Sequence, residues 1–458
     1  MKVLKFGGSS LRDGESMRMV GDIVLSEGEP KVVVVSAVQS VTDQLLEFMS
    51  ELRSEKEVQE FVRGVQETHV RLLKEITRGM ETKQQAVSQL MEKLVKLERV
   101  LYGICYLEEL TPRTRDMVQS FGEKMAVILV SGMLQDMGVN AVPLCADDLG
   151  IITDGVYGSA TADLEATRAN IREPIRERVE RGEVPVITGF FGRTDEGHIT
   201  LFGRNGTDYS ASVIGHALDA DLVEIWKDVD GFMSVDPRVV PSAVPIDELS
   251  YEEAAELSYF GAQVLHPRTV EPARKGGIAI RLMNVFKPEA EGTLIHGEPV
   301  GGRGSIKSVS CMRGMAIVKA YGASIGYRYG VISKLANLLM ELEVNIYSAA
   351  TSQTCISLLV DRSQVPRVKR HLVTHASDLV DRFEVVGDVS LVCVVGEGLG
   401  YTDGLAAKVF NAVARERVNI GMISAGASMV AYCFTVAEKD LDRTIRSIHG
   451  EFFGGDDD

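Results

Sequence analysis

Up to about residue 300, the chain alternates short apolar runs with longer helix-prone stretches. The apolar runs are rich in valine, isoleucine and leucine, and they predict strands at residues 3–6, 31–36, 139–144, 184–188, 222–225 and 278–282. Several of these runs are apolar throughout, as in a sheet that is buried on both faces. The alternation as a whole predicts an α/β fold.

Residues 58–110 are charged and helix-prone, with leucines at helical spacing: Leu90, Leu94, Leu97 and Leu101. We expect helices that pack on the sheet or on a partner subunit. A coiled coil is disfavoured because the heptads do not persist. A glycine cluster at residues 297–304 then breaks the pattern and predicts a linker.

Two stretches beyond the linker repeat one pattern. Residues 331–346 and 406–420 each predict a helix that leads into a Val-Asn-Ile strand, and a second apolar strand follows each, at residues 355–360 and 430–436. The repeat predicts two small α+β domains side by side. Such domains are either structural dimerisation modules or ligand sensors.

Composition sets broader limits. A chain of 458 residues is too long for one core and predicts about three domains, and its net charge of -16 argues against nucleic acid or an anionic membrane surface as a partner. No apolar stretch approaches the roughly 18 residues needed to span a bilayer and no signal-peptide pattern is found, which favours the cytoplasm. The six cysteines include no C-x-x-C pair and the eight histidines show no metal-ligand spacing, so neither a disulfide framework nor a metal site is predicted.

The segment K-F-G-G-S-S at residues 5–10 spans the end of the first predicted strand and the turn after it. Paired glycines let a backbone approach a bound phosphate, and the N–H groups of a following helix favour negative charge. Lys5 adds a mobile positive charge. The spacing fits neither a P-loop nor a dinucleotide-binding turn. The segment therefore predicts an anion site, with an ordinary strand-to-helix turn as the alternative.

Two further polar segments lie in the middle of the chain. G-R-N-G-T-D at residues 203–208 places Arg204 and Asp208 just before a predicted helix, where the arginine can clamp a carboxylate or phosphate and the aspartate can orient a lysine or hold a cation. A strand ending in charge, at residues 224–231, is followed by D-P-R at residues 236–238. Ligands of open α/β sheets collect beyond the carboxyl ends of the strands, so we favour a joint binding site over separate solvated turns.

Together these motifs resemble the aspartate kinases of the amino acid kinase family, which carry paired C-terminal ACT domains. The resemblance covers nearly the whole chain, and further motifs carry it: V-V-S-A at residues 34–37 with Thr42 downstream, G-E at 122–123, D-V-D-G at 228–231 and F-G-A-Q-V-L-H-P at 260–267. It implies an open, mainly parallel sheet between helix layers, followed by two ferredoxin-like α+β ACT domains.

The resemblance also implies a division of the chain. It places a catalytic domain at residues 1–298, a linker at 299–310 and ACT domains at 311–386 and 387–458, with the option that a C-terminal strand returns to the first of them. Assembly into a homodimer or homotetramer through the ACT domains is implied as well.

The activity implied is transfer of the γ-phosphoryl group of Mg-ATP to the β-carboxylate of L-aspartate, the first step toward lysine, threonine and methionine, without a covalent enzyme intermediate. Lys5 is expected to neutralise the transferring phosphoryl group, with Asp208 holding it in place. Arg204 is expected to pair with the substrate α-carboxylate, and Glu123 with the substrate ammonium. Three more residues complete the expected substrate site: Ser36, Thr42 and Thr207. The expected nucleotide site includes Gly7, Gly8, Ser9, Asp228, Met233, Arg238 and Gln263.

The chain departs from the family pattern around the nucleotide. Gln263 stands where the family usually carries a lysine, and losing one charged contact to the transition state costs about 3 kcal/mol. Lys227 stands where a threonine is usual, so we hypothesise that Lys227 supplies the missing charge. The alternative is a lysine that reaches only solvent or a nearby carboxylate. Residues 232–235 make the pocket more apolar, which leaves the nucleotide preference open.

The ACT domains diverge from their relatives too. Effector contacts are expected in the first domain, at Ser324, Tyr347, Thr351 and Gln353. The aspartate expected near Tyr347 in lysine-sensitive relatives is absent, and Gln353 replaces a glutamate. We therefore expect an effector less basic than lysine, and a purely structural role for the second domain.

Different classes of function stay open at this point. The retained site residues favour an active aspartate kinase, whereas Gln263 favours a catalytically weakened domain that acts as an amino acid sensor or regulatory subunit. A third option is an active kinase for another acidic amino acid, because Glu123 and Arg204 would contact only the amino acid backbone.

Overall fold

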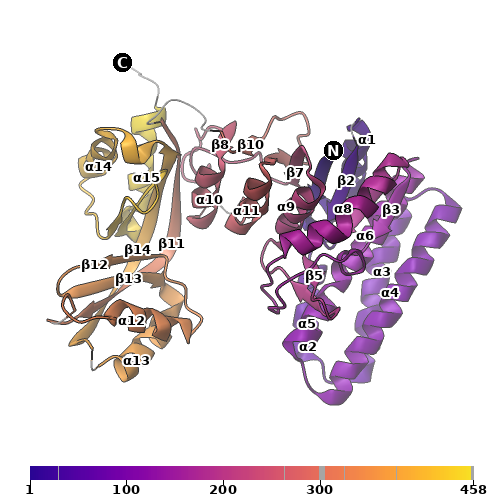
Figure 1. Cartoon of the computed structure of the whole chain (residues 1–458), viewed down its shortest axis with the longest axis horizontal. Helices are drawn as coiled ribbons and strands as arrows, with labels where there is room; N and C mark the ends of the chain where they lie inside the picture. The colour runs from indigo at the N-terminus through magenta and orange to yellow at the C-terminus, as the bar shows by residue number, and fades with distance from the viewer. Residues whose placement is uncertain (29, 262–263, 299–304, 324, 378, 455–458) are drawn as a thin grey trace. The chain divides into compact units, whose positions relative to one another are not determined.

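The computed structural model describes every residue except 29, 262–263, 299–304, 324, 378 and 455–458 (Figure 1). The chain forms two compact units. The N-terminal unit comprises Met1–Phe232, Asp247–Tyr251 and Val264–Glu298. The C-terminal unit comprises Met233–Ile246, Glu252–Gln263 and Pro299–Asp458. The segments 233–246 and 252–261, which we expected within a continuous catalytic domain, thus fold with the C-terminal unit.

An eight-stranded sheet forms the centre of the N-terminal unit, in the order β3-β4-β2-β1-β7-β9-β10-β8. All pairings are parallel except that of β9 with β10. The strands are β1 Lys2–Phe6, β2 Lys31–Val35, β3 Ala141–Leu144, β4 Val184–Thr188, β7 Leu222–Lys227, β8 Glu248–Ser250, β9 Ala279–Asn284 and β10 Thr293–His296, with a separate hairpin of β5 Phe191–Arg193 and β6 Ile199–Leu201. Every strand predicted from the apolar runs of this unit is confirmed, with small shifts at the ends.

Helices pack on the sheet of this unit, and α3 and α4 run side by side as its longest helices (Figure 1). The helices are η1 Gly8–Leu11, α1 Gly14–Ser26, α2 Val41–Glu51, α3 Glu55–Ile76, α4 Met80–Leu107, α5 Pro112–Gln119, α6 Phe121–Asp136, α7 Ala146–Leu149, α8 Leu164–Glu180, α9 Gly206–Leu218 and α11 Pro267–Gly276; α10 Tyr251–Tyr259 begins here and continues in the C-terminal unit. The leucines predicted on α4 are buried in one core with α3 and α6, which confirms helices packed within the fold.

The stretch Pro112–Asp136 corrects one expectation. It is long and apolar enough, by length and composition, to cross a membrane, although we expected no such stretch. Within the fold, 89% of the 18-residue apolar part of this stretch is buried. The whole first part of α6, from Phe121 to Leu134, is buried against the sheet and the α3–α4 pair, so core packing accounts for its apolar character.

A single antiparallel sheet of six strands, in the order β12-β13-β11-β14-β16-β15, forms the C-terminal unit. Its elements are β11 Ser305–Tyr321, α12 Val331–Met340, β12 Ser348–Thr351, β13 Cys355–Asp361, η2 Arg362–Gln364, α13 Val365–His375, β14 Arg382–Glu397, η3 Leu399–Tyr401, α14 Leu405–Arg415, β15 Ile423–Ser424, β16 Ala431–Ala437, η4 Glu438–Asp440 and α15 Leu441–Phe453. Two separate apolar cores underlie the two halves of this sheet, one beneath α12 and α13 and one beneath α14 and α15. The predicted repeat of α+β units is therefore present.

The long strands β11 and β14 change the predicted division of that unit. Residues 305–310, predicted as linker, begin β11, and the predicted boundaries at 311 and 387 fall inside β11 and β14. The first part of β11 pairs with the second part of β14, as in Ser305 with Glu397, while its last part pairs with the first part of β14. The chain entering the first α+β unit thus supplies an edge to the second. No strand follows α15 among the described residues, so a returning C-terminal strand is not found there.

The Val-Asn-Ile segments are also corrected. Both precede their strands: β12 begins at Ser348 and β15 at Ile423, after residues 344–346 and 418–420. The apolar residues of these segments, Val344 and Val418, fill the two cores from loops. A short apolar run predicts burial more securely than it predicts strand geometry. The glycine cluster lies largely outside the described residues, at 299–304.

Candidate functional site

Lys5 and Lys227 reach the same face of the N-terminal sheet because side chains alternate along a strand. In β1, Leu4 and Phe6 point into the core formed with α1, α3, α4 and α6, so Lys5 points to the opposite face, toward α9. Lys5 is in register with Ile225 of the neighbouring strand β7, and Lys227 follows two residues later. Both lysines therefore project from the carboxyl ends of adjacent parallel strands.

Asp208 lies between the two lysines. It stands in the first turn of α9, which starts at Gly206 after Asn205 in the left-handed conformation (φ 54°). Lys5 Nζ lies 2.6 Å from Asp208 Oδ1, and Lys227 Nζ lies 2.8 Å from Asp208 Oδ2. Lys227 also donates to the carbonyl oxygen of Val264. Lys5 is 4% exposed and Asp208 is 2% exposed, so the ion pairs are shielded from water.

Burial and charge act against each other in this cluster. Burial raises the pKa of Asp208, but the charges of Lys5 and Lys227 outweigh it and leave the pKa below its ordinary value. Burial lowers the pKa of Lys5, as does the charge of Lys227, while Asp208 opposes the shift. Two ammonium groups share one carboxylate, so the ionised cluster carries one net positive charge at the edge of the sheet. Such a buried positive charge can stabilise a bound phosphate.

The glycine turn beside Lys5 is closely packed. A Cβ on Gly7 would lie 3.2 Å from Lys5 Nζ, and one on Gly8 would lie 3.2 Å from the carbonyl oxygen of Ala37. Gly8 and Ser9 belong to η1, a short 3-10 helix, and α1 starts only at Gly14. The predicted strand-to-helix turn is therefore present, but a 3-10 turn separates it from the α-helix.

Glu123 brings a buried carboxylate to the same edge from α6. It is 2% exposed; its Oε1 accepts a hydrogen bond from the backbone N–H of Ala37 at 3.1 Å, and its Oε2 has no hydrogen-bond partner among the described residues. Burial raises the pKa of Glu123 to about 8. A buried oxygen without a donor is costly, which makes this group a fitting partner for a ligand ammonium.

The smaller polar residues of the expected substrate site gather around these groups. Ser36 follows β2, shares the face of Lys5, and donates its backbone N–H to the carbonyl oxygen of Phe6. Thr42 Oγ1 would lie 3.3 Å from a Cβ on Gly122, so it borders the start of α6. Thr207 is buried in the first turn of α9. The hydroxyl groups thus come from three separate elements.

Arg204 stands apart from this buried cluster. It lies in the turn between β6 and α9, is exposed, and forms no ion pair among the described residues. Its guanidinium group is open to a carboxylate ligand.

The expected nucleotide residues are divided between the two units. Asp228, in the N-terminal unit, is exposed directly after β7, and its charge raises the pKa of Lys5, against the dominant lowering by burial. Met233 and Arg238 belong to the C-terminal unit: the Met233 carbonyl accepts from Ser308 Oγ, and Arg238 pairs with Asp236 at 2.8 Å. Gln263 lies outside the described residues.

Of the expected effector residues, Ser324 is likewise outside the described residues. Thr351 is exposed at the end of β12, and Gln353 Nε2 donates to the hydroxyl oxygen of Tyr327 at 2.7 Å. Tyr347 lies beside Tyr259, with ring centroids 6.0 Å apart. Tyr327 was not predicted as a partner, because its distance along the chain hides the contact.

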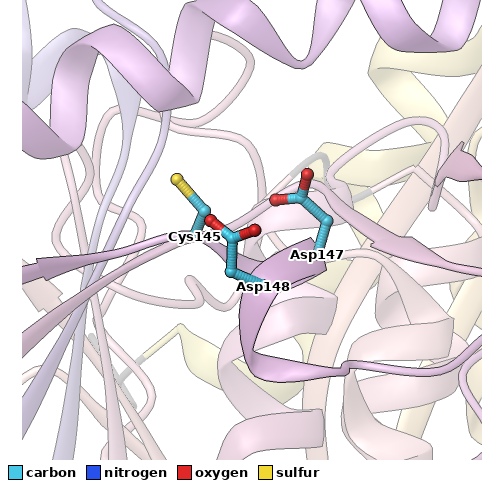
Figure 2. A group of neighbouring side chains, drawn as sticks. All are labelled: Cys145, Asp147 and Asp148. Carbon is cyan, nitrogen blue, oxygen red and sulfur yellow. The ribbon is translucent and has the colours of Figure 1, made fainter. Parts of the chain in front are cut away.

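Cys145, Asp147 and Asp148 bring potential metal ligands together around α7 (Figure 2). The ligand atoms lie within 4.8 Å of one another. Asp147 Oδ2 already pairs with Lys124 Nζ at 2.6 Å, and burial raises the pKa of the Cys145 thiol. A protonated thiol and a carboxylate neutralised by an ammonium group do not fit Mg²⁺, which prefers free oxygen ligands in an octahedral arrangement.

Two charged residues near the site were missed by the sequence analysis. Asp116 of α5 is 1% exposed and accepts two backbone N–H groups, from Gly158 and Leu201. Arg268 of α11 donates to the carbonyl oxygens of Ala160 and Phe202. The only signal for Arg268 was its place directly after the H-P dipeptide of residues 266–267.

Comparison with known proteins supplies independent information. The sequence model of the amino acid kinase family matches residues 1–284, and a model of the ACT domain matches residues 392–452. Chloroplastic aspartokinase 1 of Arabidopsis thaliana is 32% identical, over 99% of this chain and 80% of that protein. Chloroplastic aspartokinase 3 of the same plant is 33% identical, over 99% of this chain and 82% of that protein.

Solved structures give the same picture for the fold. E. coli aspartokinase III in complex with aspartate and ADP superposes with a TM-score of 0.83 at 27% identity, covering 99% of this chain and 100% of that one. The aspartate kinase of Clostridium acetobutylicum superposes with a TM-score of 0.81 at 25% identity, covering 99% and 100% of the two chains. The predicted fold class is thereby confirmed.

Proposed function

Because the chain belongs to the amino acid kinase family and, within it, to the aspartokinases, we propose that it transfers the γ-phosphoryl group of ATP to the β-carboxylate of L-aspartate, giving 4-phospho-L-aspartate. The observation that carries this proposal is the buried Lys5–Asp208–Lys227 cluster, with its net positive charge at the carboxyl edge of the sheet. The complex of the E. coli relative with aspartate and ADP supports the choice of substrates.

Positioning and charge stabilisation are the chemistry that these residues can perform. Lys5 would neutralise the transferring phosphoryl group, and Gly7 and Gly8 would offer backbone N–H groups to the phosphate oxygens. Asp208 holds Lys5 in place through the ion pair and stays ionised itself. When bound with ATP, Mg²⁺ would offset phosphate charge; its ligands would be mainly phosphate oxygens and water.

The acceptor is recognised at both ends of its amino acid backbone. Glu123 offers its unpartnered Oε2 to the ammonium group, and Arg204 offers its guanidinium group to the α-carboxylate. The hydroxyl groups of Ser36, Thr42 and Thr207 are proposed to complete the acceptor site. This arrangement favours an amino acid over a plain dicarboxylate.

Lys227 is proposed as the second catalytic lysine. Lys227 pairs with a nearby carboxylate, Asp208, as the alternative reading also expected. We favour a catalytic role because Lys5 binds the same carboxylate. A lysine bound to the same carboxylate as Lys5 adds to the positive potential at the phosphoryl site. Ser9 and Asp228 are the proposed nucleotide contacts of the N-terminal unit, and the contacts expected at Met233, Arg238 and Gln263 stay predictions.

The C-terminal unit is proposed to be regulatory. The element order of residues 305–397 resembles that of the ACT region beyond it, which supports a second ACT domain there. We expect an amino acid effector less basic than lysine at Ser324, Tyr347, Thr351 and Gln353, assembly as a homodimer or homotetramer, and a cytoplasmic location. Gln263 favours a second candidate function, an amino acid sensor with little turnover.

The decisive experiment is acyl phosphate formation trapped with hydroxylamine. Purified protein is incubated with Mg-ATP and L-aspartate, beside L-glutamate and a control without acceptor. Hydroxamate that depends on aspartate supports the proposed reaction. Hydroxamate with glutamate alone would change the acceptor, and amino acid binding without any hydroxamate would favour the sensor.

A further inference from the structure

The segment that presents Arg204 is short and has no sheet of its own beyond the β5–β6 hairpin. It runs from Leu201 at the end of β6 through Phe202 and Gly203. Leu201 and Phe202 are each 2% exposed, so each of their four backbone polar groups needs a partner. These partners decide where Arg204 stands, because no ion pair among the described residues holds Arg204 itself.

Backbone groups partner two of these four polar groups, the Leu201 carbonyl and the Phe202 N–H. The Leu201 carbonyl accepts from the N–H of Ala160 at 2.8 Å, and the Phe202 N–H donates to the carbonyl of Phe190 at 2.9 Å. Gly203 has a φ of 79° and packs so closely that a Cβ would lie 2.9 Å from the carbonyl oxygen of Gly158. The segment is therefore seated on the loop of residues 158–161.

Two charged side chains partner the remaining groups, the Leu201 N–H and the Phe202 carbonyl. Asp116 Oδ2 accepts from the N–H of Leu201 at 2.9 Å and from the N–H of Gly158 at 2.8 Å. Arg268 Nη1 donates to the carbonyl of Phe202 at 3.3 Å, and its Nη2 donates to the carbonyl of Ala160 at 2.6 Å. Each side chain thus connects the Arg204 segment to the loop of residues 158–161. Asp116 does so by accepting from two N–H groups, and Arg268 does so by donating to two carbonyls.

Arg268 has additional contacts that fix its own position. Its Nη2 donates to Thr161 Oγ1 at 3.1 Å, and its guanidinium carbon lies 5.0 Å from the ring centre of Tyr209. Tyr209 directly follows Asp208 in α9. Arg268 therefore connects the loop of residues 158–161, the Arg204 segment and the first turns of α9.

We propose that Arg268 is a positioning residue for acceptor binding: it fixes the backbone from which Arg204 reaches the acceptor α-carboxylate. This inference rests on the proposed function, which assigns Arg204 to that carboxylate. A lysine cannot replace Arg268. The planar guanidinium group contacts the carbonyls of Phe202 and Ala160 and the ring of Tyr209 at the same time, and one ammonium group cannot make all three contacts. Arg268 does not contact the reacting atoms.

The test compares R268K and R268Q with R274K and R274Q. Arg274 is exposed on the same helix, α11, and serves as the matched control. We expect R268K to raise the KM for L-aspartate about tenfold, and R268Q to raise it further, with kcat and the KM for ATP changed less than about threefold. The Kd of L-aspartate, measured calorimetrically without nucleotide, is expected to rise in parallel. The Arg274 variants are expected to match the wild type.

Melting temperatures separate positioning from general stability. If R268K binds L-aspartate as tightly as the wild type, the proposal is overturned. It is also overturned if both KM values rise together in step with a lower melting temperature. Should R268Q fail to fold, R268K alone decides, because it keeps the charge and the bulk of the side chain.

The same experiment distinguishes the two levels of the proposal. A wild-type protein that binds L-aspartate but forms no hydroxamate refutes the kinase function, and the calorimetric comparison then still decides the role of Arg268. A wild-type protein that binds no L-aspartate refutes both, since Arg204 then has no acceptor to hold.

Discussion

Buried charges occur in both units of this chain, but they are compensated differently. In the C-terminal unit, the fully buried Glu253 pairs with Lys307 at 2.8 Å, one carboxylate with one ammonium group. In the N-terminal unit, Lys5 and Lys227 bind the two oxygens of one carboxylate, Asp208, and the buried Glu123 forms no ion pair among the described residues.

The difference indicates which charges serve the fold and which serve a ligand. Burying a charge is costly unless it is paired, so a fold gains nothing from buried charges that lack an opposite charge. Among the described residues, an excess lysine and a carboxylate without an ion pair stand at the same edge of one sheet. They are explained if a phosphate and an ammonium group bind there. Matched pairs need no such explanation.

The sharpest way to break this comparison is to remove Lys5. We expect Lys5→Met to lower kcat about a thousandfold, because the charge nearest the transferring phosphoryl group is lost. Asp208 keeps Lys227 as a partner, so the fold should persist. Hydroxamate formation measures the loss, and circular dichroism checks the fold; a folded variant with near-normal turnover contradicts the site.

Removing Lys227 tests whether the second lysine is catalytic. We expect Lys227→Ala to lower kcat about a hundredfold, less than Lys5→Met, since Lys5 remains. Lys287→Ala is the matched control, because Lys287 is an exposed lysine paired with Asp230. Unchanged turnover in Lys227→Ala, with loss in Lys5→Met, would refute the idea that Lys227 replaces the missing charge at Gln263.

Removing Lys307 should affect stability instead of turnover. We expect Lys307→Met to lower the free energy of unfolding by about 2 kcal/mol, because Glu253 loses a charged partner inside the fold. Urea unfolding measures this change. Turnover under native conditions should stay within about twofold of the wild type. A large loss of kcat at unchanged stability would contradict a purely structural role for the Glu253–Lys307 pair.

The smallest expected effect concerns Glu123 and pH. Its pKa of about 8 leaves the carboxyl group largely neutral at pH 7, whereas the acceptor ammonium requires the ionised form. The affinity for L-aspartate should therefore rise up to tenfold per pH unit as pH increases toward about 8, and then level off. Binding below that pH should release a proton, which calorimetry in buffers of different ionisation enthalpy detects.

Glu123→Gln is the control for this pH dependence, because it keeps the shape and removes the titration. Its affinity should be lower and flat with pH over the same range. The stability of the ligand-free protein changes in the opposite direction. Because the raised pKa means that the folded state holds the proton more tightly, the Glu123 contribution to stability falls as pH rises from about 4.5 toward about 8. An unchanged pH profile in Glu123→Gln would exclude this group as the ammonium partner.

Much of the fold could be predicted from local patterns. The apolar runs at residues 3–6 and 184–188 became β1 and β4, and the helical leucines of α4 are buried as their spacing indicated. The Val-Asn-Ile segments were wrongly predicted as strands, because three residues are too few to show a periodicity that separates a strand from a buried loop. The lengths of β11 and β14 were also missed, since each continues through a change in its pairing partner.

The candidate site divides in the same way. The sequence by itself determined that the first strand carries a lysine near its end and is followed by two glycines, and that Asp208 opens a helix after a glycine turn. Those are local features, set by side-chain alternation, glycine geometry and helix starts. Only the tertiary structure decided that Lys5 and Lys227 share Asp208, that Glu123 is buried with one open oxygen, and that Arg268 and Asp116 hold the Arg204 segment. The physical reason is that strand order and register bring these groups together from distant parts of the chain, and no local pattern encodes which distant side chains will share a carboxylate or a carbonyl.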